Sequence, residues 1–293
     1  MKIAVVGAGY WGSKIVSTIE KIGHECLAVD IKQGSTIDDI DCNMAVVATP
    51  AHTHFDIADK LLAKGCHVLI EKPVAHTTDQ INKLCDTADK KNLILMAGHV
   101  LCYTDLIKRL QKVTQKQNVL HIESRRLAWG KMHDDISPIL NFAPHDVSVL
   151  DFLLKGAMPN TASAKGYRFD SRPQPDYVVC DLDYGDFVAQ LQLGWYYPTK
   201  TRTITTTTDQ GQYVWDDVES SWKFFANQMS GKYQTSNIDM AQHYIDPKIK
   251  SPVQNYIEHF INCVEQGKEP ITGKEHAKRV TKVVQMLEES LNV

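Results

Sequence analysis

Residues 2–12 read KIAVVGAGYWG, an apolar run that leads directly into a turn with three glycines. The run Lys2–Val6 predicts a short strand that is buried on both faces. After the turn, Ser13–Ile22 has isoleucines at helical spacing, which predicts an amphipathic helix. A second apolar run, Cys26–Val29, ends at Asp30. This order of strand, glycine turn, helix, strand and acid predicts a dinucleotide-binding βαβ unit.

Each glycine of this turn has its own expected role. Gly7 allows the tight turn, Gly9 lets the main chain approach a pyrophosphate, and Gly12 lets the helix pack close to the strand. The helix N-terminus offers unpaired N–H groups and the positive end of its dipole to the phosphates. At the end of the second strand, the Asp30 carboxylate accepts hydrogen bonds from ribose hydroxyls and repels a 2′-phosphate. NAD is therefore predicted in preference to NADP, although Lys32 nearby softens the preference.

The composition is typical of a soluble globular protein, and 293 residues predict two domains. A net charge of -3 gives no electrostatic footprint for nucleic acid or an anionic membrane. Apolar runs stay well short of the roughly 18 residues that span a bilayer. The first strand begins at Lys2, which leaves no room for a signal peptide. Seven scattered cysteines without a C-x-x-C pair predict reduced thiols, so a cytoplasmic protein is expected.

The alternation of short apolar runs and amphipathic stretches continues beyond the first βαβ unit. Apolar runs at Asn43–Ala48, His67–Ile70 and Leu93–Ala97 predict further strands with helices between them. The interval Ile31–Cys42 is short and polar, where many doubly wound domains have another helix and strand. Residues 1–117 are therefore predicted to form an α/β Rossmann domain with a doubly wound parallel sheet that is trimmed at this interval.

From residue 118 the pattern changes to longer alternating strands around one strongly apolar helix. A two-residue hairpin, Gly185-Asp186, joins two of these strands. Residues 118–293 are therefore predicted to form a second domain, for which the family resemblance described below implies substrate binding and oligomerisation. Its predicted elements are strands at Val119–Leu127, Val178–Tyr184, Phe187–Gly194, Thr201–Thr208 and Gln212–Trp215, helices at Ser137–Leu154, Pro252–Gln266 and Lys274–Leu291, and a loop-rich stretch at Gln228–Pro252.

Two positions are candidates for catalysis. Lys72 follows the strand His67–Ile70 and lies between Glu71 and Pro73, at the strand end where ligands of an open parallel sheet bind. His145 lies in the apolar helix of the second domain, one helical turn after Asn141, which could orient its ring. The alternatives are a surface lysine in a turn and a histidine satisfied in the core.

Two other kinds of site are not favoured. The chain has no G-x-S-x-G elbow, so a Ser-His-Asp hydrolase is not predicted. His52 and His54 are close in sequence, but no H-E-x-x-H motif or cysteine pair accompanies them. We therefore predict no metal site.

Several motifs together resemble the Gfo/Idh/MocA family of NAD(P)-dependent oxidoreductases. They are the glycine turn, Thr49-Pro50-x-x-x-His54, the segment Val68–Pro73 with its Glu-Lys-Pro ending, and Ala143-Pro144-His145-Asp146. Further segments resemble the branch that oxidises UDP-N-acetylglucosamine-type sugars at C3. They are Gly98-His99 with Tyr103, Ser124-x-Arg126, Trp195-Tyr196-Tyr197-Pro198-x-Lys200, Tyr213-x-x-Asp216, and His259-Phe260-Ile261 with Glu269-Pro270.

The resemblance implies a Rossmann domain followed by an α+β domain with a large, mostly antiparallel open sheet. The open face of that sheet would form the interface of a homo-oligomer, a dimer or a tetramer. It also implies that Lys72 and His145 line the hydride-transfer site and that the Lys72–Pro73 bond is cis. The implied cofactor-binding residues are Gly7, Gly9, Tyr10, Trp11, Gly12, Asp30, Thr49, Pro50, His54, Glu71 and Lys72.

The family often has an aspartate where this chain has Asn141. An amide cannot share a proton as a carboxylate can, and it gives His145 no anionic partner that would raise its pKa. A proton relay at this position is therefore not assured, and Asn141 could instead only hydrogen-bond the substrate. The implied catalytic residues are Lys72, His145 and Asn141, and the implied substrate-binding residues are Lys72, His99, Tyr103, Arg126, Asn141, His145 and Lys200.

An anionic substrate is predicted from two cations. By strand alternation Arg125 and Arg126 point to opposite faces, and Arg126 is predicted to face the crevice. Its planar fork of donors suits a carboxylate or a phosphate. Lys200 adds charge beside aromatic side chains that could stack on a sugar or a base. The alternative is two ordinary surface cations.

The sequence and the resemblance together predict an NAD-dependent dehydrogenase that oxidises a secondary hydroxyl, expected at C3, of a sugar, most plausibly a nucleotide-linked one. A free-polyol dehydrogenase, for example of inositol, is the alternative within enzymes. A dinucleotide-binding regulatory or accessory protein without turnover is the alternative from another class, and Asn141 is its only hint.

Overall fold

The computed structural model describes residues 1–30, 36–130, 132–134, 136–226, 240–245 and 250–293. The apolar run that opens the chain forms β1 (Lys2–Val6), whose four last residues are fully buried. It belongs to a five-stranded parallel sheet with the strand order β2-β1-β3-β4-β5. The other strands are β2 (Glu25–Val29), β3 (Met44–Val47), β4 (His67–Glu71) and β5 (Leu95–Gly98).

The strand order confirms the predicted doubly wound sheet and locates its ligand edge. The chain leaves β1 in one direction, toward β2, and then continues in the other direction from β3 to β5. Ligands of such sheets bind at the carboxyl ends of the strands on either side of this reversal. Between β2 and β3 the described residues contain only the short 3-10 helix η2 (Ile37–Asp39), as the trimmed interval predicted. Lys32 lies outside the described residues.

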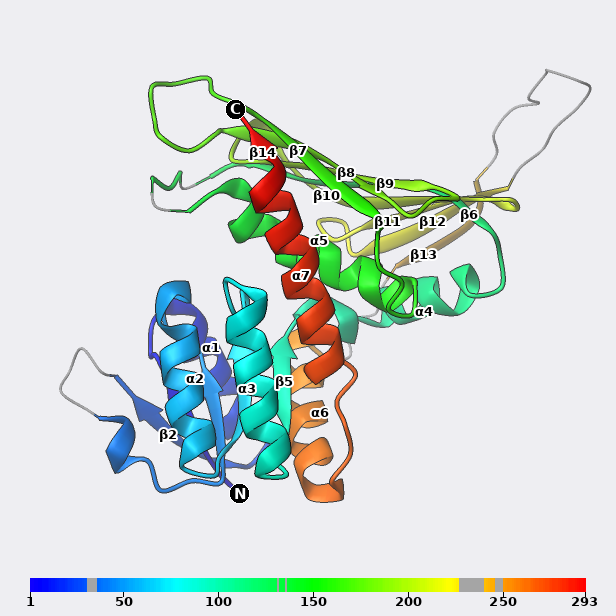
Figure 1. Cartoon of the computed structure of the whole chain (residues 1–293). Helices are drawn as coiled ribbons and strands as arrows, with labels where there is room; N and C mark the ends of the chain where they lie inside the picture. The colour runs from blue at the N-terminus through cyan, green and yellow to red at the C-terminus, as the bar shows by residue number, and fades with distance from the viewer. Residues whose placement is uncertain (31–35, 131, 135, 227–239, 246–249) are drawn as a thin grey trace, which may run out of the picture. The chain divides into compact units, whose positions relative to one another are not determined.

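Helices cover the parallel sheet within the first unit of the chain (Figure 1). The helices α2 (His54–Ala63) and α3 (Thr78–Lys90) share one apolar core with the strands. The helix α1 (Tyr10–Lys21) buries Ile15 and Ile19. It begins at Tyr10 rather than at the predicted Ser13, so Gly12 lies in its first turn. Two further 3-10 helices are η3 (Ala51–Thr53) and η4 (Val100–Tyr103).

The second sheet has nine strands in the order β13-β12-β11-β10-β6-β9-β8-β7-β14. Only the pairs β6–β9 and β7–β14 are parallel, which confirms a large, mostly antiparallel sheet. The strands β7, β12, β13 and β14 were not predicted, and β13 lies inside the stretch predicted to be loop-rich. The bounds are β6 (Val119–Trp129), β7 (Thr161–Tyr167), β8 (Tyr177–Asp183), β9 (Val188–Gly194), β10 (Tyr196–Thr208), β11 (Gly211–Asp216), β12 (Ser221–Ala226), β13 (Met240–Ile245) and β14 (Leu291–Asn292).

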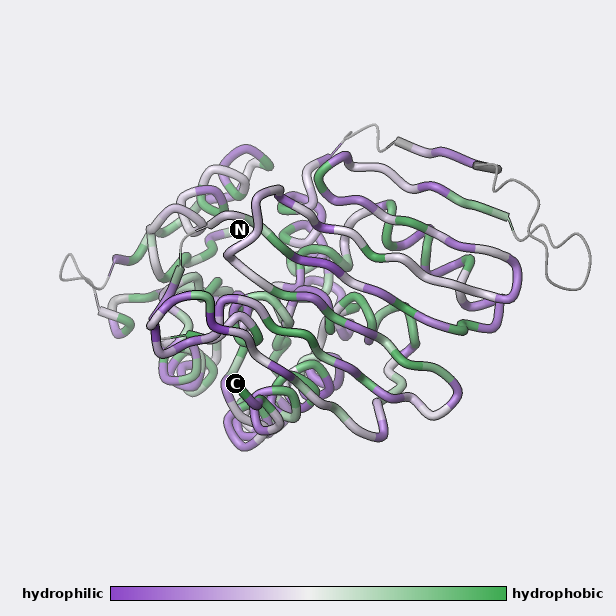
Figure 2. Tube along the Cα trace, turned by 90° about the horizontal axis from the view of Figure 1, so that it is seen from above, coloured by the Kyte–Doolittle hydropathy of each residue, from purple (hydrophilic) through white to green (hydrophobic). Residues whose placement is uncertain are grey.

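Two helices cover one face of the nine-stranded sheet, α4 (Asp105–Thr114) and α5 (Pro138–Leu153) (Figure 1). Apolar and polar residues alternate along its strands (Figure 2). In β8, for example, Val178, Cys180 and Leu182 are completely buried. On the opposite face of β6 and β10 the side chains are polar, Glu123 and Thr205 among them. Its role as an oligomer interface stays a prediction.

The chain divides into units differently from the predicted boundary at residue 117. One unit is Met1–Thr104 with Ile249–Gln285, and the other is Asp105–Lys248 with Met286–Val293. The C-terminal helix α6 (Pro252–Gln266) packs against α1 and η4, whereas α4 packs against α5. The apolar stripe of α6 predicts that the helix packs against another element. It does not predict to which unit that element belongs. The last helix, α7 (Lys274–Ser290), is not long and apolar enough to cross a membrane, nor is any other helix among the described residues.

Candidate functional site

A cavity of about 640 Å³ lies at the carboxyl edge of the parallel sheet. The glycine turn, the end of β2 and the segment after β3 line it. It brings together most of the predicted cofactor-binding residues and adds others that the sequence did not indicate. The predicted ones are Gly7, Gly9, Tyr10, Trp11, Asp30, Thr49 and Pro50, and the added ones are Ala8, Ala48, His52, Thr53 and Ile57.

His52 and Thr53 were missed because the sequence indicated only a loop between β3 and α2. The 3-10 helix η3 turns both residues back toward the cavity. Thr53 directly precedes α2. Its hydroxyl donates to Thr49 Oγ1 at 2.7 Å, and no side-chain cap is present at this helix end.

The main chain of the glycine turn fits a pyrophosphate. Gly7 has a φ of +101°, and a Cβ there would lie 2.7 Å from the Ala48 carbonyl. A Cβ on Gly12 would lie 1.8 Å from the Gly7 oxygen, so Gly12 is needed for close packing of α1. In contrast, a Cβ on Gly9 would meet no protein atom within 4 Å, so the space beside Gly9 is open. No side chain caps the N-terminus of α1, which leaves its first turn able to bind an anion.

Lys72 lies at the same edge of the sheet as the glycine turn. In the sheet, Val6 pairs with Val47, and Val47 pairs with Ile70. The ends of β1 and β4 are therefore two strand spacings apart, roughly 10 Å. The Lys72 side chain is half-buried, and its bond to Pro73 is cis, as the family resemblance implied.

Glu71 is not among the residues that line the cavity, and its predicted role in binding the cofactor stays a prediction. The side chain is buried, and Tyr256 of α6 donates a hydrogen bond to Glu71 Oε1 at 3.0 Å. Burial raises the pKa of Glu71, although donors on Trp11 and Tyr256 oppose the shift. Since Tyr256 is far away in sequence, no local pattern could have indicated this contact.

His54 is also directed into the protein rather than into the cavity. Its ring is 2% exposed, and both ring nitrogens face main-chain carbonyl oxygens. The predicted contact between His54 and the cofactor stays a prediction. Among the described residues, no three His, Cys, Asp or Glu side chains lie close enough together to hold a metal ion.

His99 and Tyr103 have polar partners within the first unit, and their predicted contact with the substrate stays a prediction. His99 Nδ1 lies 2.8 Å from His276 Nε2, and the Tyr103 hydroxyl lies 2.8 Å from Thr272 Oγ1. Both side chains are 1% exposed, and burial raises the pKa of Tyr103. These polar contacts connect the segment around η4 to His276 and Thr272, which lie in the C-terminal part of the same unit.

In the second unit, α5 carries Asn141 and His145 on neighbouring turns. The helix begins where predicted, because the Ser137 hydroxyl accepts a hydrogen bond from the Leu140 N–H at 3.1 Å. Asn141 and His145 are both half-buried. Lys72 belongs to the first unit and His145 to the second, so their action on one substrate stays a prediction.

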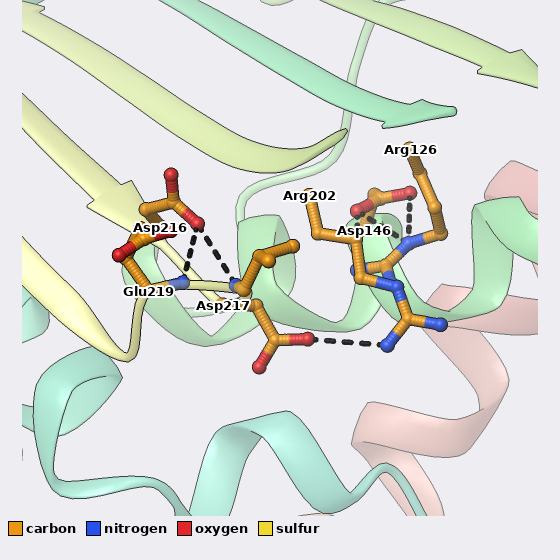
Figure 3. A network of polar contacts seen from close by, with 7 residues as sticks. Arg126, Asp146, Arg202, Asp216, Asp217 and Glu219 are labelled. Atoms are coloured by element: carbon orange, nitrogen blue, oxygen red, sulfur yellow. Dashed lines mark hydrogen bonds and ion pairs between the residues drawn. The ribbon is translucent and has the colours of Figure 1, made fainter. Parts of the chain in front are cut away.

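Arg126 forms a buried ion pair within the second unit (Figure 3). Its Nε lies 3.1 and 3.0 Å from the two Asp146 oxygens, and its Nη2 lies 2.9 Å from Oδ1. The cross-strand neighbour of Arg126 is Arg202, which pairs with Asp217 at 3.3 Å. Each of these adjacent arginines thus has its own carboxylate. Asp146 binds Nε and Nη2 of the Arg126 fork, and a contact between Arg126 and a substrate anion stays a prediction.

The other predicted cation, Lys200, is exposed near the start of β10. Aromatic rings lie in the same part of the second unit, with Trp129 and Tyr196 centroids 4.7 Å apart. Trp129 is 63% exposed. Lys200 therefore stays a predicted substrate contact beside an accessible aromatic surface.

Comparison with known proteins first defines the class. Residues 18–99 match the sequence model of an oxidoreductase family with an NAD-binding Rossmann fold, Gfo/Idh/MocA. The 2,7-anhydro-N-acetylneuraminate hydratase of Mediterraneibacter gnavus is 26% identical over 193 residues, which cover 56% of this chain and 51% of that protein. The UDP-N-acetylglucosamine 3-dehydrogenase of Acidithiobacillus ferrooxidans is 33% identical over 121 residues, 41% of this chain and 38% of that protein. The chain thus spans about half the length of these curated relatives or less.

Solved structures resemble the chain over nearly its whole length. The A. ferrooxidans UDP-N-acetylglucosamine 3-dehydrogenase GnnA has a TM-score of 0.85 at 19% identity, covering 99% of this chain and 97% of that one. GenD2 from gentamicin A biosynthesis, solved with NAD, has a TM-score of 0.80 at 19% identity, covering 99% and 93%. Residues 18–99 thus match the Gfo/Idh/MocA family of oxidoreductases, and the solved structures show the fold of the whole chain. The predicted resemblance to this family, the fold class and the NAD-type cofactor are thereby confirmed.

Proposed function

We propose that the protein is an NAD-dependent dehydrogenase that oxidises a secondary hydroxyl, at C3, of a nucleotide-linked sugar. The observation that carries this proposal is the double similarity to one protein, the A. ferrooxidans UDP-N-acetylglucosamine 3-dehydrogenase. That protein is 33% identical in the aligned part of the sequence, and its solved structure covers 99% of this chain. The cavity at the glycine turn, with Lys72 at the same sheet edge, supplies the cofactor side of the proposal.

The proposed mechanism divides the work among three side chains. When bound in the cavity, NAD supplies the acceptor for the hydride that leaves the sugar carbon. Lys72 holds the substrate oxygen and stabilises charge that develops on it. His145 takes the hydroxyl proton as a general base. Asn141 cannot relay that proton, so it orients the substrate or the His145 ring by hydrogen bonding.

A second candidate has a specific observation in its favour. Two 2,7-anhydro-N-acetylneuraminate hydratases, of M. gnavus and Escherichia coli, align over 193 and 194 residues, which is further than the dehydrogenase does. A reaction on an anhydro sugar acid is therefore the second candidate. The free-polyol dehydrogenase and the non-catalytic accessory protein are further alternatives.

The purified protein with NAD should be tested on four compounds. They are UDP-N-acetylglucosamine, free N-acetylglucosamine, inositol and 2,7-anhydro-N-acetylneuraminate. NADH formation and the mass of the sugar product are both followed. We expect NADH and a sugar lacking two hydrogens from the nucleotide sugar alone. Conversion of the anhydro sugar would instead favour the second candidate, and binding of NADH without turnover of any compound would favour an accessory protein.

We further propose a cytoplasmic homo-oligomer that associates through the open face of the nine-stranded sheet. That face has polar residues, such as Glu123 and Thr205. Polar residues are common in protein interfaces, and they also allow the face to be exposed to water in the monomer. Light scattering should give the mass of a dimer or a tetramer. A Thr205→Lys substitution, in the middle of β10, should reduce that mass toward the monomer without changing NADH affinity.

A further inference from the structure

His54 is the first residue of α2, and its ring lies beneath the turn that follows β3. Nε2 lies 2.7 Å from the carbonyl oxygen of Thr49, and Nδ1 lies 2.8 Å from the carbonyl oxygen of Pro73. These are the distances of well-formed hydrogen bonds. One histidine therefore joins two loop segments that follow neighbouring strands, β3 and β4.

Both partners of the His54 ring are acceptors without a proton. A neutral imidazole has only one N–H, so it can donate to only one of the two carbonyls. The imidazolium has two N–H groups and can donate to both. The observed pair of short contacts is thus satisfied only by the protonated ring. In the neutral ring one nitrogen lone pair would face a carbonyl lone pair, and that contact would have to open.

The surroundings of the His54 ring favour loss of its second proton. Burial lowers the pKa of His54, and the two carbonyl contacts oppose that shift. His76 and Lys72 are the charged neighbours, and both act to lower the pKa. The ring is therefore not held permanently in its charged form, and the number of carbonyls that it binds depends on pH.

The two carbonyls belong to the two segments that matter most for the proposed function. Thr49 lines the cavity at the glycine turn, and Pro73 directly follows Lys72. We propose that His54 is a positioning residue that ties the cofactor-side segment at Thr49 to the Lys72 segment through its two ring nitrogens. The proposal rests on the proposed function only for the role of Lys72.

Two amide substitutions separate the two contacts of the ring. The amide nitrogen of Asn lies near the position of Nδ1, so His54→Asn keeps the donor to Pro73 and loses the donor to Thr49. The amide nitrogen of Gln lies near Nε2, so His54→Gln keeps the donor to Thr49 and loses the donor to Pro73. Loss of one hydrogen bond from a charged donor corresponds to about tenfold in an equilibrium or rate constant.

The expected result is a split between binding and turnover. His54→Asn should raise the Kd for NADH about tenfold with little change in kcat, and His54→Gln should lower kcat about tenfold with little change in the Kd. In the wild type, NADH affinity should fall as the pH rises through the pKa of His54 if the ring releases Thr49, and kcat should fall if it releases Pro73, because the neutral ring donates to only one carbonyl. Neither amide titrates, so both variants should lose this pH dependence. The matched control is His24→Asn, whose ring lies 3.3 Å from the N-terminal amine in the same unit and which should keep it.

A spectroscopic measurement on the unmodified protein covers the case in which the variants do not fold. In the ¹⁵N spectrum of histidine-labelled wild-type protein, both His54 nitrogens should carry protons at the acid end of the pH range in which the protein stays folded, and one should lose its proton as the pH rises. A single neutral tautomer across this range in the folded protein would overturn the proposal. So would equal NADH affinity and equal kcat in the two amide variants. If the sugar assigned above is wrong, the NADH titrations and the spectrum still decide the matter, because neither needs a substrate.

Discussion

The glycine-turn cavity of the first unit and the Arg126–Asp146 pair of the second unit were both expected to bind ligands. The cavity contains most of the predicted cofactor-binding residues, whereas the Arg126 guanidinium binds a carboxylate of its own unit. The two predictions differ in the kind of atoms that form each site. Main-chain N–H groups and missing Cβ atoms form the first site, and these follow directly from glycine spacing. A long charged side chain takes whichever partner the fold brings to it, and spacing does not specify that partner.

The largest effect on activity is expected at Lys72 and His145. The sequence predicts that both side chains contact the substrate. Lys72→Ala and His145→Ala should each lower kcat by about 10²–10⁴-fold on the nucleotide sugar, because each acts on the substrate hydroxyl. NADH affinity should change little, since main-chain atoms and Asp30 hold the dinucleotide. Steady-state kinetics and NADH fluorescence titration measure the two quantities.

A matched control for Lys72 is Lys83→Ala, in α3 of the same unit. Lys83 is 58% exposed and pairs with Asp59 on the surface, so its loss should leave kcat unchanged. Near-normal kcat in either Lys72→Ala or His145→Ala would mean that the substituted residue has no catalytic role. The roles of these two side chains, like the partner of Arg126, would then not follow from the sequence.

The next effect is on stability and compares two arginines that face each other across β6 and β10. Arg126→Ala leaves Asp146 as a buried, unpaired charge and should cost about 3–5 kcal/mol in the free energy of unfolding. Arg202→Ala breaks a half-exposed pair and should cost about 1 kcal/mol or less. Urea denaturation of both variants measures the difference. An Arg126→Ala variant that is as stable as the wild type but loses activity on the nucleotide sugar alone would contradict this expectation. It would support the predicted contact between Arg126 and the substrate.

Much of the fold could be predicted because its elements carry strong local patterns. The bounds of β1, α5 and α6 follow from an apolar run and from serine caps, and the structure reproduces them within a residue. The strands β12 and β13 were missed because the alternation of apolar and polar residues in their sequences is weak. The return of α6 to the first unit was missed because an amphipathic stripe does not name the surface that it covers.

The same contrast holds within the candidate site. Gly7, Gly9, Asp30 and Thr49 were found because a phosphate and a ribose require a particular turn and a particular acid at the strand ends. The inward positions of Glu71, His99 and Tyr103 depend on Tyr256, His276 and Thr272, which lie far along the chain. Nothing in the local sequence around these three residues identifies those partners.

A smaller effect is expected from Glu71, the carboxylate that the first unit buries. Its pKa is raised by folding, so the folded state holds a proton that the unfolded state releases. Stability should therefore fall as the pH rises from the unfolded pKa to the folded one, by at most about 1.4 kcal/mol per pH unit for this group. Glu71→Gln cannot ionise and should remove that part of the slope. Denaturant unfolding at several pH values tests this, and an unchanged slope in the variant would show that Glu71 is ionised in the folded protein.

Main-chain atoms at the glycine turn are central to the proposed NAD site. The direct test is a fluorescence titration of the wild type and of Gly9→Ala with NADH and with NADPH. A Cβ at Gly9 meets no protein atom, so the variant should keep the melting temperature of the wild type while its methyl group enters the cavity. We predict saturable binding of NADH by the wild type, at least about tenfold weaker binding of NADPH because of Asp30, and a similar loss of NADH affinity in the variant. Equal or tighter binding of NADPH, or a variant that binds NADH as tightly as the wild type, would contradict the account.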